Sequence, residues 1–303
     1  MSAITTADRL LAKRKFGIFT HFLAHNEPGG WDETVNNFDV PALAKNLSDI
    51  GAGWYFITLM QGRRYMCAPN AAFDAIAGTR PGEACATRDL PADIIAALKP
   101  RGIDFCLYFT GDGPYKDSPE GDRFGFTEPR ERGVNAAFVQ KWTSVLREYA
   151  LRYGSDVSAW WIDGMYKDYL KYTDELAAYY TAACAAGNPD ALVALNDGVA
   201  DGLVHSFPSE TMTTGEFNSF CHIPATRFID GAQAHILAPL GYHEDEWNRW
   251  CKPGCQHTKE YMADYIRRCN DIGCLVTIDV GIDARGHIDP AQLELLAWVS
   301  ANV

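Results

Sequence analysis

The sequence predicts an α/β protein, a (β/α)8 TIM-like barrel that occupies residues 1–303 as a single domain. Short β-branched and aromatic runs recur along the chain, each followed by a polar turn and a segment with helical periodicity. The runs are mostly unbroken and apolar, as expected for parallel strands that helices cover. A length of 303 residues is sufficient for eight such units in one domain.

Eight runs are predicted strands, and their number favours a closed barrel. In chain order they are residues 15–22, 54–61, 104–111, 158–164, 191–196, 211–217, 234–240 and 274–280. A doubly wound open sheet is the alternative, but no G-x-G-x-x-G follows the first run and no phosphate-binding loop occurs. No linker rich in Pro, Gly or Ser divides the chain.

Capping signals and apolar stripes place helices between these strands. One helix is predicted within residues 89–102, which begin with Asp89 and end with Gly102. Two stripes with helical spacing are formed by Phe138, Trp142, Val145 and Tyr149 and by Tyr261, Tyr265, Cys269 and Ile272. A last helix is predicted to begin after Asp289, with Gln292 at its third position.

The charge balance excludes several partner classes. The 27 Lys and Arg stand against 39 Asp and Glu, a formal charge of −12, so neither nucleic acid nor a membrane surface is an expected partner. The first residues lack the apolar core of a signal peptide, and no run approaches the roughly 18 apolar residues of a membrane span. We therefore expect a cytoplasmic protein, with most of its nine cysteines reduced and buried.

Polar residues at the carboxyl ends of the predicted strands are the candidate site, because barrels place their active sites there. They are Thr20, His21, Gln61, Asp112, Asp163, Asn196, Asp197, Glu216 and Asp279. Asp163 ends a strongly apolar run between Trp161 and Gly164. It is either a residue that caps the turn or an oriented carboxylate in a dry site, as a nucleophile or general base requires.

Glu216, on the predicted sixth strand, is the first candidate for a second carboxyl group that acts together with Asp163. Glycoside hydrolysis uses one ionised carboxylate and one protonated carboxyl group in different surroundings. The rivals for the protonated group are Glu210, Asp230, Glu244 and Glu246, each of which is otherwise a solvated loop charge.

Metal and acyl-transfer chemistry have less support. Cys251, Cys255 and His257 are close in sequence, but no second pair stands at zinc-finger spacing and no H-E-x-x-H occurs. We therefore expect no metal and no other cofactor. The G-x-S-x-G motif of serine hydrolases is also absent.

Four segments, in the same order, resemble the catalytic barrel of the α-L-fucosidases, glycoside hydrolase family 29. They are residues 15–22 (Lys-Phe-Gly-Ile-Phe-Thr-His-Phe), 88–109, 161–164 (Trp-Ile-Asp-Gly) and 274–292. The resemblance implies that Asp163 is the catalytic nucleophile and that His21 contacts the sugar. It also implies a hydrolase that takes a small-molecule or oligosaccharide substrate.

The sequence departs from the family pattern in three places. Residues 60–64 read Met-Gln-Gly-Arg-Arg where members commonly carry a His-His pair, and these fixed cations predict an acidic or unusually substituted sugar. The acid/base varies within the family, and Glu216 is our first choice here, with Asp230 second. The usual C-terminal β-sandwich is not expected, and a barrel without it could cover an apolar patch by forming a homo-oligomer.

The predicted function is hydrolysis of an α-linked glycoside, with Asp163 attacking the anomeric carbon and Glu216 or Asp230 moving the proton. The predicted substrate contacts are His21, Trp31, Gln61, Arg63, Tyr108, Trp161 and Arg227. A sugar-binding barrel without catalysis is one alternative. A barrel lyase or isomerase that uses His21 is another.

Overall fold

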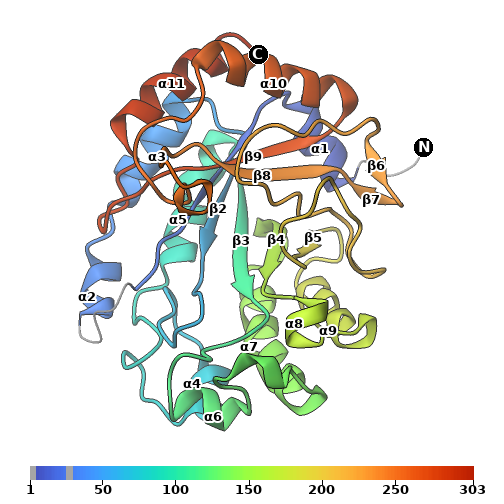
Figure 1. Cartoon of the computed structure of the whole chain (residues 1–303). Coiled ribbons are helices and arrows are strands. Elements are labelled where there is room, and N and C mark those ends of the chain that lie inside the picture. Colours follow the sequence, from blue (N-terminus) through green and yellow to red (C-terminus); the bar gives the residue numbers. More distant parts are fainter. Residues whose placement is uncertain (1–4, 25–29) are drawn as a thin grey trace.

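The computed structural model describes residues 5–24 and 30–303, and a curled parallel sheet lies at its centre (Figure 1). Seven strands pair in the order β5-β4-β3-β2-β1-β9-β8. They are β1 (Gly17–Thr20), β2 (Trp54–Thr58), β3 (Asp104–Thr110), β4 (Val157–Asp163), β5 (Leu192–Leu195), β8 (His235–Pro239) and β9 (Leu275–Asp279). A separate antiparallel hairpin, β6 (Phe228–Ile229) with β7 (Ala232–Gln233), was not predicted from the sequence. The predicted α/β class is confirmed.

Helices surround this sheet, and all of them except the first contribute residues to the hydrophobic layer on its outer face (Figure 1). They are α1 (Thr6–Ala12), α2 (Trp31–Asn36), α3 (Val40–Asp49), α4 (Ala71–Ala77), α5 (Leu90–Leu98), α6 (Glu120–Phe124), α7 (Ala136–Tyr153), α8 (Lys167–Leu170), α9 (Asp174–Ala185), α10 (Lys259–Ile272) and α11 (Pro290–Ser300). Short 3-10 turns are η1 (Lys99–Arg101), η2 (Arg130–Arg132), η3 (Gly154–Asp156) and η4 (Glu246–Asn248). The predicted caps are confirmed, since the Asp89 and Asp289 side chains accept from Ala92 N and Gln292 N.

Strand side chains alternate between two hydrophobic layers, as the pleat requires. Trp160 of β4 packs with the outer helices, whereas Trp161 points inside the curl. Phe56 of β2 and Tyr108 of β3 share that inner layer with Leu10 of α1. The interior of the curled sheet is therefore filled with side chains rather than open.

The predicted closed eight-stranded barrel requires a correction, because residues 211–217 form no ladder strand. Thr211 N donates to Val193 O of β5 at 2.9 Å, and single bridges connect the segment to the β7–β8 side. The Thr213 hydroxyl accepts from His235 N at 2.9 Å and donates to His235 O at 3.0 Å, which takes up the backbone groups that a strand would pair. The segment thus lies between the two edge strands without a regular ladder.

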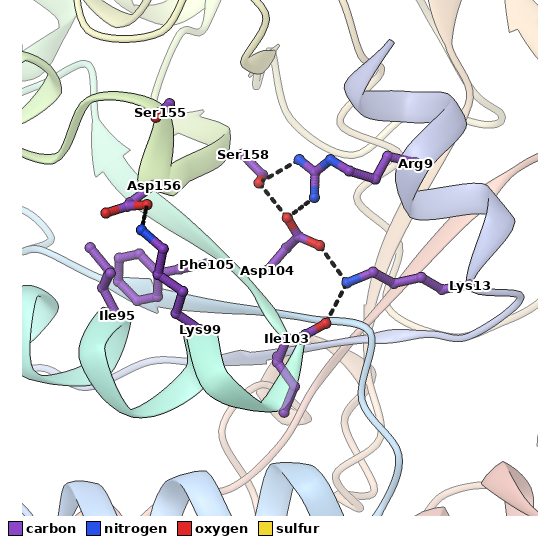
Figure 2. A pocket seen from close by; sticks show the side chains of 11 residues that line it. Arg9, Lys13, Ile95, Lys99, Ile103, Asp104, Phe105, Ser155, Asp156 and Ser158 are labelled. Atoms are coloured by element: carbon purple, nitrogen blue, oxygen red, sulfur yellow. Dashed lines mark hydrogen bonds and ion pairs between the residues drawn. The ribbon is translucent and has the colours of Figure 1, made fainter. Parts of the chain in front are cut away.

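Helix α1 covers the amino ends of the strands. Its Arg9 and Lys13 side chains both pair with Asp104 at the start of β3, and Arg9 also donates to Ser158 Oγ at 3.0 Å (Figure 2). These groups line a cavity of about 480 Å³. Its carboxylates are paired, which makes this end a structural closure of the barrel core rather than a reactive site.

Two further observations bear on the sequence predictions. None of the helices in the described part of the chain combines the length and the apolar composition of a membrane span. All nine cysteines are free thiols, and six of them are buried.

We predict that Asp104→Asn destabilises the protein by about 1–3 kcal/mol at neutral pH. Burial raises the pKa of Asp104, but hydrogen bonds from Lys13, Arg9 and Ser158 bring it below its ordinary value. A lowered folded-state pKa stabilises the fold above the unfolded value of about 4, and that contribution is lost as the pH falls through the folded-state pKa. Urea unfolding of both proteins over a pH series measures the difference, which should shrink in acid.

The matched control is Asp156→Asn, which removes the partner of the exposed Lys99 ammonium at 2.7 Å. An exposed ion pair contributes little, so we expect a loss below about 0.5 kcal/mol. Equal losses in the two variants would contradict the role given to Asp104.

Candidate active site

A cavity of about 340 Å³, called here the main cavity, lies at the carboxyl ends of the strands. It is lined by His21, Leu23, Gln61, Tyr108, Trp161, Asp163, Tyr166, Glu216, Leu237, Trp250 and Cys251. Six of the residues that the sequence predicted for the site meet here: His21, Gln61, Tyr108, Trp161, Asp163 and Glu216. They come from strands β3 and β4, the position directly after β1, the turn after β2 and the irregular segment 211–217.

One side-chain amide joins the two central carboxyl groups of the main cavity. Asn196 Nδ2 donates to Asp163 Oδ1 and to Glu216 Oε2, at 2.8 Å in both cases. The amide is oriented by its own oxygen, which accepts from Gly198 N at 3.0 Å. The two carboxyl oxygens therefore lie within twice 2.8 Å of each other.

Asp163 accepts hydrogen bonds at both oxygens. Besides Asn196, its partners are the Tyr108 hydroxyl at 2.5 Å and Gln61 Nε2 at 3.2 Å. Burial and the charge of Asp163 raise the pKa of Tyr108 well above its ordinary value, which keeps this hydroxyl protonated as a donor. Three donors directed at one carboxyl group hold it in a fixed orientation.

Glu216 occupies a different environment. Gly215 directs it into the main cavity from a left-handed backbone conformation, and any side chain at position 215 would meet His235 O at 2.0 Å. Burial and the charge of Asp163 raise the pKa of Glu216 to about 7, against the opposing hydrogen bond from Asn196. Glu216 is therefore partly protonated near neutral pH.

His21 is held by a buried acid. Its Nδ1 lies 2.7 Å from Asp279 Oδ1, and Asp279 Oδ2 accepts from Cys251 N at 2.7 Å. Burial lowers the pKa of His21, but the charges of Cys251 and Asp279 outweigh this effect and raise the pKa well above its ordinary value. Burial also raises the pKa of the Cys251 thiol. With Nδ1 engaged, His21 Nε2 is the ring nitrogen left for a ligand.

His21, Cys251 and Asp279 are also the described residues that could hold a metal ion, with ligand atoms within 4.8 Å of one another. The imidazole and carboxylate are hydrogen-bonded at 2.7 Å, closer than two ligands about 2 Å from one ion would stand. The group as it lies is a hydrogen-bonded dyad beside a thiol. The suggested Cys251–His257 grouping is not formed by these contacts, since His257 Nε2 pairs with Ser219 Oγ.

Four predicted site residues lie outside the lining of the main cavity: Trp31, Arg227, Asp230 and Arg63. Trp31 is buried and donates to Met66 O at 2.9 Å. Arg227 pairs with Asp8 of α1 at 2.7 Å, at the amino end of the sheet, because it stands before β8 rather than after it. Asp230 is an exposed residue in the turn between β6 and β7.

The arginines after β2 do not offer free positive charge. Arg63 pairs with Asp117 at 3.1 Å, and Arg64 pairs with Glu120 at 2.6 Å. Asp117 also accepts from Arg64 N at 2.5 Å. Both guanidinium groups are therefore compensated, which removes the charge on which the expectation of an acidic sugar depended.

Sequence reasoning gave no specific catalytic or binding role to four contributors to the site. Asn196 and Asp279 were among the candidates because they stand at strand ends, but nothing in the sequence indicated which groups they would contact. Trp250 and Cys251 lie in the long connection between β8 and α10, where periodicity carries no information about direction. Their place beside His21 depends on how that connection folds back over the sheet.

No protein-family model matches the chain, and no curated protein matches it. Solved structures do match. A variant of the endo-fucoidan hydrolase MfFcnA4, of glycoside hydrolase family 107, has a TM-score of 0.75 at 15% identity, over 97% of this chain and 53% of its own. For the endo-fucoidan hydrolase P5AFcnA of that family the TM-score is 0.71 at 16% identity, over 96% and 92%.

The α-L-fucosidase isoenzyme 1 from Paenibacillus thiaminolyticus matches with a TM-score of 0.63 at 17% identity, over 98% of this chain and 76% of its own. The chain spans about half the length of the MfFcnA4 variant. Matches at these identities establish the fold, and the resemblance that the sequence motifs indicated is confirmed at that level.

We predict that Asp163→Asn lowers the pKa of Glu216 from about 7 toward its ordinary value, because the charge of Asp163 is one cause of the rise. Carboxyl carbon-13 resonances, titrated with and without the change, measure this without any substrate. Asp230→Asn is the control and should leave the Glu216 titration in place. An unshifted Glu216 in Asp163→Asn would contradict the coupling between the two groups.

Proposed function

We propose that this protein is a glycoside hydrolase that cleaves an α-linked fucoside with retention of configuration. Asp163 is the nucleophile in this proposal, and Glu216 is the acid/base. The observation that carries it is the single amide nitrogen of Asn196 that hydrogen-bonds both carboxyl groups.

The spacing of the carboxyl groups supports retention. Retaining glycosidases separate theirs by about 5–5.5 Å, whereas inverting enzymes need about 6.5–9.5 Å for an intervening water. Oxygens that each lie 2.8 Å from one donor nitrogen are at most twice that distance apart, which is below the separation that inverting enzymes need. A nucleophile at this distance from the acid reaches the anomeric carbon directly.

The environments of the two groups support their roles. Glu216, with its raised pKa, gives its proton to the glycosidic oxygen while Asp163 bonds to the anomeric carbon and the leaving group departs. In the second half Glu216 takes a proton from water, whose oxygen displaces Asp163. Tyr108, Gln61 and Asn196 hold Asp163 in place through both steps.

The proposed sugar class comes from two sources. The structural neighbours are named as endo-fucoidan hydrolases and α-L-fucosidases. The sequence segments around His21 and Asp163 resemble the α-L-fucosidases, and both residues line the main cavity. His21 Nε2 and the aromatic faces of Trp161 and Trp250 would contact the hydroxyl groups and the C–H face of the sugar.

We predict that Asp163→Asn lowers kcat on an aryl α-L-fucoside by about 10³-fold or more, because the nucleophile is lost. Circular dichroism should show an unchanged fold. Asp230→Asn is the matched control and should retain activity. Near-wild-type turnover by Asp163→Asn, or a comparable loss in Asp230→Asn, would refute the assignment.

The pH profile provides a separate prediction. The acid must be protonated, so kcat/KM should fall as the pH rises through about 7, where Glu216 loses its proton. Asn196→Ala removes the hydrogen bond that lowers the pKa of Glu216, so the descending limb should move to higher pH. A limb that stays in place in Asn196→Ala would show that another group titrates.

A further inference from the structure

A second cavity, of about 230 Å³ and called here the side cavity, adjoins the main one at Glu216. Its wall is built from the loop that follows β5, residues 197–206, and from residues 214–216. Glu216 lines both cavities. Asp163 lines the main cavity and is not part of the side-cavity lining. The two carboxyl groups thus divide the space around the strand ends into two compartments.

In glycoside hydrolysis the two carboxyl groups contact different parts of the substrate, so each cavity corresponds to a different part. The nucleophile must face the anomeric carbon, so the sugar that becomes bound to Asp163 occupies the main cavity. The acid must contact the glycosidic oxygen, beyond which the leaving group begins. The leaving group therefore extends past Glu216 to the side that Asp163 does not line.

We propose that the side cavity binds the first sugar unit of the leaving group, and that this unit is neutral. This inference rests on the proposed hydrolase function. It makes the protein an enzyme for oligosaccharides, whose leaving group is itself a sugar.

The lining of the side cavity fits such a ligand. Gly198 and Gly202 leave room beside the backbone, and Val199 and Val204 present apolar side chains that are 43% and 47% exposed. The charged residues among the described lining are Asp197 and Glu216, with no cation. An anionic substituent would meet these two carboxyl groups, which disfavours its binding. The nearby Lys167 ammonium lies outside the lining, where it donates to Ser206 O and pairs with Asp174.

The side-cavity wall is held against the catalytic pair. Glu210, which is 4% exposed, accepts from Leu195 N at 3.1 Å and from Ser206 N at 2.5 Å. It therefore ties the end of the 197–206 loop to strand β5, and Gly198 N is bonded to Asn196. A wall fixed to the residue that orients both carboxyl groups is preorganised for a leaving group at Glu216.

Gly202→Trp tests the proposal by filling the side cavity. A Cβ atom at position 202 meets no atom within 4 Å, and the backbone there is not left-handed, so the residue accepts a side chain. The probes are α-L-fucosyl fluoride, whose fluoride leaves with the bonding pair and needs no sugar-sized space, and a neutral α-L-fucosyl disaccharide. We expect the ratio of kcat/KM for the disaccharide to that for the fluoride to fall at least about tenfold.

Leu151→Trp, on the outer helix α7 at a side chain that is 50% exposed, is the matched control and should leave the ratio unchanged. Val204→Trp is a second filling variant that guards against misfolding of the first, and it should lower the ratio in the same way. A ratio that stays at the wild-type value in both filling variants overturns the side-cavity proposal. A wild-type protein that cleaves neither probe overturns the proposed hydrolase function instead.

Sulfated and unsulfated forms of one oligosaccharide test the neutral character. Calorimetric binding to Asp163→Asn, which removes the proposed nucleophile and keeps both carboxyl groups of the side-cavity lining, should favour the form whose leaving-group unit is unsulfated by about tenfold or more. Equal or tighter binding of the sulfated unit would contradict the charge argument.

Discussion

Two carboxyl groups held close together in a poorly solvated cavity are the constraint on which this site depends. Like charges at this distance cannot both be ionised cheaply, so one of the pair keeps its proton near neutral pH. Asn196 sets the geometry of the pair, since one nitrogen reaches both groups. Its backbone is equally fixed, because Asn196 N donates to Ile162 O and its carbonyl accepts from Met165 N, on either side of Asp163.

The rest of the molecule supports this arrangement by compensating charge elsewhere. The protein carries a formal charge of −12, yet the half-buried Asp104 at the amino ends of the strands and the buried Glu120 beside Arg64 both have cationic partners. Asp279 is matched by His21. The main cavity is thereby left with a carboxyl pair and one imidazole, the combination that proton transfer to a sugar oxygen requires.

Irregular backbone at one edge of the sheet is what brings Glu216 into this position. A regular strand over residues 211–217 would bury alternate side chains inside the curl and offer its backbone to both neighbours. Instead, Thr213 uses its hydroxyl on the backbone of His235, and Gly215 takes a left-handed conformation directly before Glu216. Structures that share this fold at 14–18% identity show how far sequences can diverge around the same curled sheet.

The sequence by itself determined the α/β class, the seven ladder strands, the principal helix caps and the placing of Asp163 at a strand end. These features are local, because periodicity, capping and strand ends are encoded within a few residues of one another. The tertiary structure alone decided which distant groups meet. It brought Asp279 to His21 across 258 positions of the chain and directed Asn196 between two carboxyl groups. It also placed Arg227 at the opposite end of the sheet, because contacts between distant segments depend on the whole path of the chain.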